Sequence, residues 1–193
     1  MICQGLSHIH IPLRENVFDD ILSCVNKFDL SNVEDGLAGD QNNEKRRKCK
    51  LSWLAYDETV DYNRKLYTIL WDIGKHYALQ MGVNNWKIEH IESIQYTNYD
   101  VGDHYNWHID VYPNPDFRRK LSGIILLNDD YTGGEIDLET KIPQTDFSNR
   151  YTRFSMKKGD LLFFDSTLPH RVRKVTSGNR KSLVFWYNGP LFV

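Results

Sequence analysis

The side chains of this sequence that could bind a metal ion together are His108, Asp110 and His170. His108 and Asp110 are two residues apart, so in an extended segment they point to the same face and can hold one ion. His170 follows residues 158–169, which read as a buried strand and a turn. The distant strand can therefore supply a third ligand to the pair.

The combination of two imidazoles and one carboxylate favours a particular chemistry. On one side of a metal, this ligand set is typical of non-haem Fe(II) in oxygenases, and it leaves coordination positions open for a co-substrate and dioxygen. Arg180 lies ten residues after His170, on the next predicted strand. Its planar guanidinium can hold a carboxylate through two hydrogen bonds and stays charged in a closed pocket. We expect it to anchor the far end of a dicarboxylate.

An ordered series of motifs surrounds these candidates. A His-x-Asp triplet alone is weak, because short polar triplets arise by chance, but the series is specific. It consists of Tyr99-x-x-Gly102-x-x-Tyr105-x-x-His108-x-Asp110, Leu126-Leu127-Asn128, Gly133-Gly134-Glu135, Lys157-Lys158-Gly159-Asp160 and His170-Arg171-Val172-x-x-Val175-x-x-Gly178-x-Arg180-x-x-x-x-x-Trp186. Over about residues 90–188 it resembles the 2-oxoglutarate and Fe(II)-dependent dioxygenases of the prolyl 4-hydroxylase type. One departure is Arg180, where the best-known prolyl 4-hydroxylases have Lys and bacterial relatives have Arg.

The resemblance implies a fold, cofactors and roles for the residues. The fold is a double-stranded β-helix, or jelly roll, mainly β with supporting helices. Fe(II) is held by His108, Asp110 and His170, and 2-oxoglutarate chelates the iron through its 2-oxo acid end. The other carboxylate is bound by Arg180 and the Tyr99 hydroxyl. The reaction uses O2, with ascorbate as an activator, and hydroxylates a C–H bond while releasing succinate and CO2.

The substrate is open at the level of the sequence. Peptidyl proline comes first, because the overall pattern is closest to the prolyl hydroxylases and long loops could hold an extended chain. The alternatives are a free amino acid or other small molecule, and a non-catalytic cupin-like binding module. Four intact residues, His108, Asp110, His170 and Arg180, argue against the module. Repair of alkylated bases is disfavoured, because that branch has a second Arg where this chain has Trp186.

Length, charge and cysteine content limit the other function classes. The 193 residues suit a single domain, with helical support over about 1–87 and a catalytic core over about 88–188. The 24 basic and 26 acidic residues are mixed, which disfavours nucleic-acid and membrane partners. Three widely spaced cysteines without a Cys-x-x-Cys pair indicate a reducing, cytoplasmic setting. The sequence has no long apolar run and no basic leader at its start.

The hydrophobic pattern predicts two helices followed by many strands. Helical spacing covers residues 15–28 and 58–81, the latter ended by Gly82. Strands are expected at 88–99, 121–127, 135–138, 154–157, 160–164, 171–175 and 181–187. Residues 30–50 read as a polar segment without regular structure, and its basic run 44–48 as a solvated loop. Residues 140–153 read as a long loop that could cover the site.

Other polar and aromatic residues suggest chemistry less strongly. His8 and His10 share a strand face without a third ligand, so a structural role is favoured. For His104 we expect a supporting or surface position, and for Trp186 a place in the core. Asp129, Asp130 and Glu135 read as parts of a hairpin turn. Four aromatic residues are expected to shape the pocket together, namely Tyr96, Tyr105, Trp107 and Tyr112.

Overall fold

Two helices and a series of mostly antiparallel strands make up the described part of the chain. The computed structural model describes residues 7–36, 46–81, 87–111, 118–140 and 150–190. The helices are α1 (Glu15–Val25) and α2 (Asp61–Gln80). The strands are β1 (His8–Pro12), β2 (Glu34–Asp35), β3 (Arg47–Lys48), β4 (Lys50–Leu54), β5 (His90–Ile91), β6 (Ile94–Tyr99), β7 (His104–His108), β8 (Arg118–Leu126), β9 (Thr132–Gly133), β10 (Ile136–Glu139), β11 (Tyr151–Phe154), β12 (Asp160–Asp165), β13 (His170–Val172), β14 (Val175–Ser177) and β15 (Arg180–Gly189).

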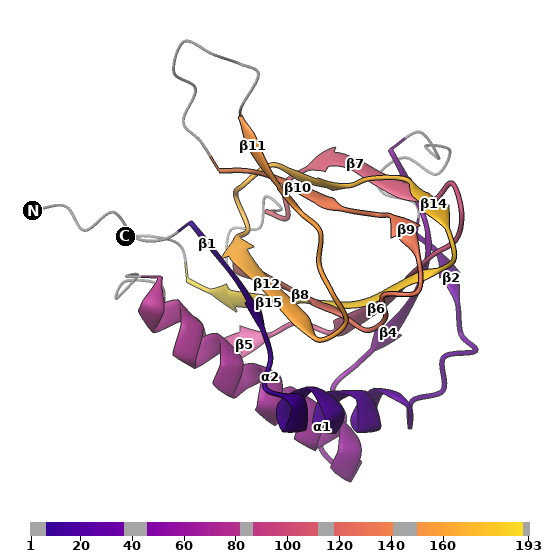
Figure 1. Ribbon diagram of the computed structural model, residues 1–193. Coiled ribbons are helices and arrows are strands. Elements are labelled where there is room, and N and C mark those ends of the chain that lie inside the picture. The colour runs from indigo at the N-terminus through magenta and orange to yellow at the C-terminus, as the bar shows by residue number, and fades with distance from the viewer. Residues whose placement is uncertain (1–6, 37–45, 82–86, 112–117, 141–149, 191–193) are drawn as a thin grey trace, which may run out of the picture.

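The strands form two facing sheets and one short ribbon. The large sheet has the order β1-β12-β8-β15-β6-β4-β2, with β5 paired to β15, and the smaller sheet has the order β11-β10-β13-β7-β3. Strands β14 and β9 pair separately. Figure 1 shows both helices on one side of the large sheet and the smaller sheet on its other side. This arrangement is the jelly roll with helical support that the sequence predicts.

Strand β15 shows why the large sheet has two different faces. Leu183, Phe185 and Tyr187 point toward the helices and belong to the main hydrophobic core with residues of α1 and α2. The alternate residues on the other face include Arg180 and Trp186, because successive side chains of a strand point in opposite directions. The large sheet therefore packs on helices with one face and carries polar and aromatic groups toward the smaller sheet with the other.

The space between the sheets is filled by two further clusters. Ile124, Leu162 and Phe164 of the large sheet pack against Ile136 and Leu138 of the smaller one. A second cluster contains Cys49, Tyr99, Val172 and Val175. These apolar groups hold the two sheets together and surround the region into which the candidate metal ligands point.

The predicted helices and strands agree with the structure apart from their ends. Helix α1 ends at Val25 rather than at residue 28, and α2 begins at Asp61. The proposed stop at Gly82 lies outside the described residues. Every predicted strand overlaps an observed one, although only Phe154 of the stretch 154–157 belongs to β11. Element ends depend on local capping and pairing, which periodicity does not resolve.

Two segments predicted to lack regular structure contain strands. Within residues 30–50, β2 and β3 form, and β4 begins at Lys50. The prediction missed β3 and the start of β4 because exposed charged residues alternate with buried ones over residues 46–51, a period of two that the polar composition obscured. Residues 140–153, predicted as a long loop, end inside β11. Residues 37–45 and 141–149 lie outside the described part of the chain.

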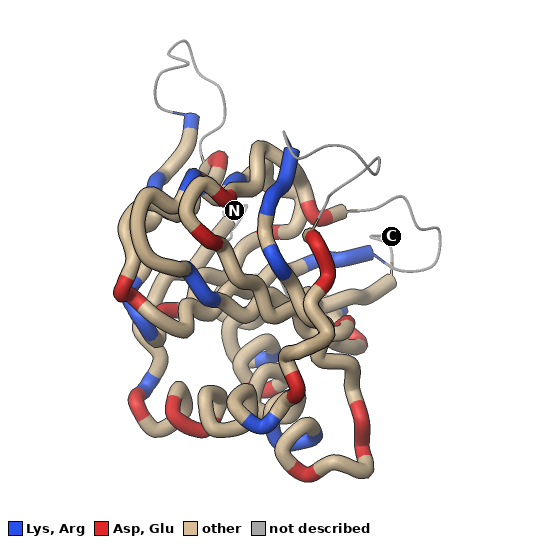
Figure 2. Tube along the Cα trace, turned by 90° about the vertical axis from the view of Figure 1, so that its right-hand side faces the viewer, with Lys and Arg blue, Asp and Glu red and all other residues tan. Residues whose placement is uncertain are grey.

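Basic and acidic residues are mixed along the chain. Figure 2 shows Lys and Arg interspersed with Asp and Glu on the side viewed there, as the mixed charge of the sequence indicates. In the part of the chain that the structure describes, no helix is both long and apolar enough to cross a membrane. Cys24 and Cys49, the cysteines within this part, are free thiols and buried.

The contact between α2 and β15 yields a test of the fold. A Cβ added at Gly74 would lie 2.1 Å from Tyr187 Cε1, and the Tyr187 hydroxyl donates a hydrogen bond to the Leu70 carbonyl. Because this overpacking outweighs the better helix propensity of alanine, we expect Gly74→Ala to lower the free energy of unfolding by about 1–3 kcal/mol. Urea denaturation measures it. The exposed neighbouring change Lys75→Ala should stay within about 0.5 kcal/mol of the unchanged protein, and equal losses would contradict this packing.

Candidate metal centre

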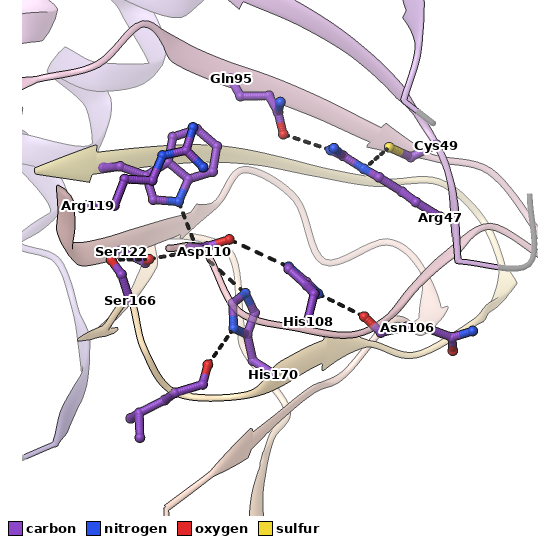
Figure 3. Close-up of polar contacts among 12 residues, drawn as sticks. Arg47, Cys49, Gln95, Asn106, His108, Asp110, Arg119, Ser122, Ser166 and His170 are labelled. Atoms are coloured by element: carbon purple, nitrogen blue, oxygen red, sulfur yellow. Dashed lines mark hydrogen bonds and ion pairs between the residues drawn. The ribbon is translucent and has the colours of Figure 1, made fainter. Parts of the chain in front are cut away.

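The three predicted ligands converge between the two sheets. His108 ends β7, Asp110 lies two residues further, and His170 begins β13 directly opposite His108 in the strand pairing. Their ligand atoms all lie within 4.8 Å of one another. Asp110 Oδ1 is 3.6 Å from His108 Nε2, and Asp110 Oδ2 is 3.6 Å from His170 Nε2. Figure 3 shows the three side chains pointing toward one another.

Both imidazoles are oriented by the backbone of their own strands. His108 Nδ1 lies 2.8 Å from the Asn106 carbonyl oxygen, and His170 Nδ1 lies 2.9 Å from that of Leu168. A carbonyl only accepts hydrogen bonds, so each Nδ1 carries a proton and each Nε2 is directed toward the centre. Burial, followed by the charge of the neighbouring His170, lowers the pKa of His108 to about 3. The neutral ring, the form that binds metals, is therefore favoured.

Asp110 is held by two side chains that sequence reasoning did not single out for this role. Ser122 Oγ donates to Asp110 Oδ2 at 2.7 Å, and Trp186 Nε1 donates to the same oxygen at 2.8 Å. Burial raises the pKa of this carboxyl, but both histidines and these two donors lower it below its usual value. Trp186 is buried as expected, yet its indole supports the candidate ligand. One feature of the sequence could have indicated this role. Trp186 follows Arg180 by six residues, an even spacing that places both side chains on one face of β15.

Arg180 is a buried cation without an anionic partner in the described part of the chain. Its side chain is 2% exposed, its NH1 donates to Ser182 Oγ at 2.9 Å, and its Nε has no hydrogen-bond partner. It pairs with Tyr99 across β15 and β6, and its guanidinium carbon lies 5.6 Å from the Tyr99 ring centre. Because an unsatisfied buried charge is costly, this group fits an anionic ligand.

Tyr99 is suited to help bind the same ligand. Its side chain is 3% exposed, and burial raises the pKa of its hydroxyl. The hydroxyl thus keeps its proton and can donate it in a hydrogen bond to a carboxylate. Both residues to which the sequence gave a carboxylate-binding role therefore lie side by side, on neighbouring strands that face the smaller sheet.

A cavity of about 310 Å³ opens at the metal ligands and contains a residue that the sequence reasoning set aside. Arg47 of β3 is 9% exposed and donates from Nε to Cys49 Sγ at 3.1 Å and from NH2 to Gln95 Oε1 at 2.7 Å. Its guanidinium lies over the Tyr105 ring, which stacks on His108. The prediction of a solvated loop is therefore wrong at Arg47, because strand pairing with β7 turns this side chain inward.

The other polar residues considered in the sequence lie away from the cavity. His104 lies on the opposite face of the smaller sheet, in a separate groove. His8 and His10 are on the edge strand β1, where His10 contacts Asp160. Asn128 donates to Asp130 in the expected turn.

Among the four aromatic residues expected to shape the pocket, Tyr105 lines the cavity. Tyr96 packs toward the helices, and Trp107 is 39% exposed, so the prediction was wrong for both. An irregularity in the pairing of β13 with β7 separates Tyr105 from Trp107, which simple alternation would place on one face. Tyr112 lies outside the described residues.

Comparisons with known proteins agree with the fold and the motifs. Residues 94–188 match the model of the 2OG-Fe(II) oxygenase superfamily. A PKHD-type hydroxylase of Prochlorococcus marinus is 32% identical over 98 residues, which are 50% of this chain and 41% of that protein. The match thus spans less than half of that relative's length.

Two solved structures have the same fold. The Pseudomonas putida prolyl-4-hydroxylase superposes with a TM-score of 0.69 at 16% identity, covering 94% of this chain and 91% of that one. A Trichoplax adhaerens prolyl hydroxylase, in complex with a hypoxia inducible factor peptide fragment, gives 0.72 at 22% identity, covering 94% and 83%.

These findings define a 2OG-Fe(II) oxygenase region over residues 94–188, with the fold seen in prolyl hydroxylases of known structure. The resemblance recognised in the motifs is confirmed, and so is the jelly-roll fold. The groups present suit the cofactors that this class implies. Two imidazoles and a carboxylate are a donor set that suits Fe(II), and Arg180, which has no anionic partner among the described residues, suits a dicarboxylate.

The contact between Trp186 and Asp110 yields a test of the metal centre. Trp186→Phe keeps an aromatic ring in place but removes the hydrogen bond to Oδ2, so the carboxylate is less well oriented. We expect about ten- to a hundredfold weaker metal binding, measured by titrating Fe(II) without oxygen or Mn(II) in air. Asp110→Ala should abolish tight binding while the sheet stays folded. Trp71→Phe, on α2 and outside the cavity, serves as the control, and an unchanged affinity in Trp186→Phe would contradict this role.

Proposed function

We propose that this chain is an Fe(II)- and 2-oxoglutarate-dependent dioxygenase that hydroxylates a peptidyl proline. The observation that carries the proposal is the combination of three converging ligands with a buried cation that has no anionic partner among the described residues. The three ligands suit a metal ion, and the buried cation suits an anion. A dicarboxylate with a 2-oxo acid end satisfies both, since one end can chelate the metal while the other reaches Arg180.

The chain's own residues would perform distinct tasks in this reaction. His108, Asp110 and His170 would hold Fe(II), and the iron, with 2-oxoglutarate and O2, supplies the oxidising chemistry that yields succinate, CO2 and a hydroxylated product. Arg180 and Tyr99 bind the far carboxylate and thereby orient the co-substrate. Ser122 and Trp186 hold one oxygen of Asp110, which directs the other toward the metal.

Apolar side chains complete the site by limiting water. Ile124, Val172 and Val184 line the cavity from both sheets, and a dry pocket strengthens the attraction between Arg180 and a carboxylate. This lining also limits side reactions of the oxidant with water. The protein therefore contributes geometry, charge and exclusion of solvent, while the metal supports the difficult step.

The choice of peptidyl proline is supported by the mouth of the cavity. Trp53 is 42% exposed there, its ring lies 6.3 Å from that of Trp186, and Arg119 stacks over Trp186. Aromatic faces suit a prolyl ring, and a prolyl hydroxylase with this fold is known in complex with a peptide fragment. A cavity of about 310 Å³ would also hold a free amino acid, which is the second candidate.

The carboxylate clamp can be tested by binding alone. In Arg180→Ala, a carboxylate loses its charged partner in a poorly solvated pocket, which we expect to cost about 2–5 kcal/mol, or about 30- to several-thousand-fold in 2-oxoglutarate affinity. Tyr99→Phe removes one neutral donor and should cost about 0.5–1.5 kcal/mol. Calorimetric titration of the Mn(II)-loaded protein gives both values. Lys181→Ala, an exposed cation on the same strand, is the control, and equal affinities for Arg180→Ala and this control would refute the clamp.

The substrate class is tested by mass spectrometry. Given Fe(II), 2-oxoglutarate, ascorbate and a library of proline-bearing peptides, the protein should add one oxygen, about 16 Da, to a prolyl residue and form succinate in equal amount. Free proline should turn over poorly, because it lacks the chain that contacts the mouth of the cavity. The Asp110→Ala variant is the inactive control. Robust hydroxylation of a free amino acid, with all peptides inert, would favour the small-molecule alternative.

A further inference from the structure

Trp53 of β4 lies between the metal cavity and a second groove on the surface. It lines the cavity that contains His108, and it also lines an open groove of about 770 Å³ beside the turn between β4 and α2. Its ring lies 6.3 Å from that of Trp186, whose indole nitrogen donates to Asp110. Trp186 and Trp53 therefore link the candidate metal ligands to this groove.

The groove is lined by aromatic side chains that are partly open to solvent. We call it the aromatic groove, and its rings are those of Phe28, Trp53, Tyr56 and Tyr62. Tyr56 is 54% exposed, and its ring packs against Tyr67 of α2 at 5.0 Å. Phe28 and Tyr62 pack edge to face, also at 5.0 Å. Such fixed rings suit an extended proline-containing segment, because neither partner loses much conformational freedom on binding.

The charged residues that line the aromatic groove are acidic, although the Lys27 amine lies nearby, 6.0 Å from the centre of the Tyr62 ring. Asp57 and Glu58 line the aromatic groove, whose described lining includes no Lys or Arg, and Glu34 and Asp35 line the adjoining part of the metal cavity. Among the described residues, none of these four carboxylates forms an ion pair with a cation of the chain. Hydrogen bonds from Thr59 hold the pKa of Asp57 below its usual value, so this carboxylate stays ionised.

The cations that do border the metal cavity are already engaged. Arg47 is bonded to Cys49 and Gln95, and Arg119 donates to both carboxylate oxygens of Glu92. Neither arginine forms an ion pair with any of the four carboxylates. An acidic surface with exposed rings attracts a cationic chain, through the carboxylates and through contact of cations with aromatic faces.

We propose that the aromatic groove binds the segment of the peptide substrate that flanks the hydroxylated residue, and that this segment is extended, contains proline and carries Lys or Arg. This inference rests on the proposed function, because the groove matters only if the neighbouring cavity receives a peptide. It narrows the substrate class to basic proline-containing peptides. It also assigns Tyr56, Asp57 and Glu58, which do not line the metal cavity, to substrate selection.

The test compares short and long peptides with one target proline. The short peptide has only the target and its immediate neighbours, and the long ones extend it on either side with a flank containing Pro and Lys. For the long peptide that binds best, Tyr56→Ala should raise KM by about two- to fivefold, with kcat and the KM of the short peptide unchanged. The double change Asp57→Asn with Glu58→Gln should raise the KM of a long peptide with a Lys-bearing flank by a similar factor. It should leave the KM of a long peptide with a Glu-bearing flank unchanged.

Matched controls separate the groove from a general effect on the fold. Tyr151→Ala removes another exposed tyrosine, 36% exposed, from the outer face of the smaller sheet, and it should change neither KM. Equal effects of Tyr56→Ala on short and long peptides, or no effect on either, would overturn the inference. So would tighter binding of Glu-bearing than of Lys-bearing flanks.

A binding measurement tests the aromatic groove independently of catalysis. Fluorescence anisotropy with a labelled Lys- and Pro-containing flank peptide, on the Mn(II)- and 2-oxoglutarate-loaded protein, needs no turnover. Weaker binding to Tyr56→Ala, with unchanged binding to Tyr151→Ala, supports the groove even where no proline is hydroxylated, in which case the proposed function alone fails. Equal binding to both variants rejects the groove while leaving hydroxylation of short peptides intact.

Discussion

The pairing of β7 with β13 is the constraint on which the candidate site depends. It places His108 directly opposite His170, and the bend after β7 brings the Asp110 carboxylate to both rings. A carboxylate and two imidazoles buried together are unfavourable unless each polar atom is satisfied. Backbone carbonyls orient the rings, and Ser122 with Trp186 orients the carboxylate. The remaining lone pairs point at one another, which is an arrangement that a cation completes.

The two faces of the large sheet have different roles. One packs on the helices, and the other carries groups of the candidate site. Its helix-facing side chains form the main hydrophobic core, in which Tyr187 packs into the space that Gly74 leaves open. The other face of the same strands carries Arg180, Ser122 and Trp186. Because alternate residues of one strand serve these two purposes, the positions of the functional groups are set by the packing of the helices. A site on rigid strands keeps its geometry better than one on loops.

Charges of opposite sign lie at different places in and around the site. Arg180 lies at a buried position with no anionic partner among the described residues, whereas Glu34 and Asp35 line the metal cavity and Asp57 and Glu58 line the aromatic groove. In the function proposed above, a dianionic co-substrate would be attracted to Arg180, and a cationic chain to the carboxylates. Opposite charges at these places would orient the two reactants differently before any reaction begins.

The sequence by itself indicated the class of the protein and predicted a ligand triad and a carboxylate-binding pair, because short-range spacing and ordered motifs report side-chain direction on strands. It also predicted the two helices, whose apolar period is long and strong. Only the tertiary structure decided that Arg47 turns inward, that Trp186 supports Asp110 and that Trp53 joins two hollows. Each of these depends on pairing between segments far apart in the chain, and the polar composition of residues 30–50 gave no indication of their partners.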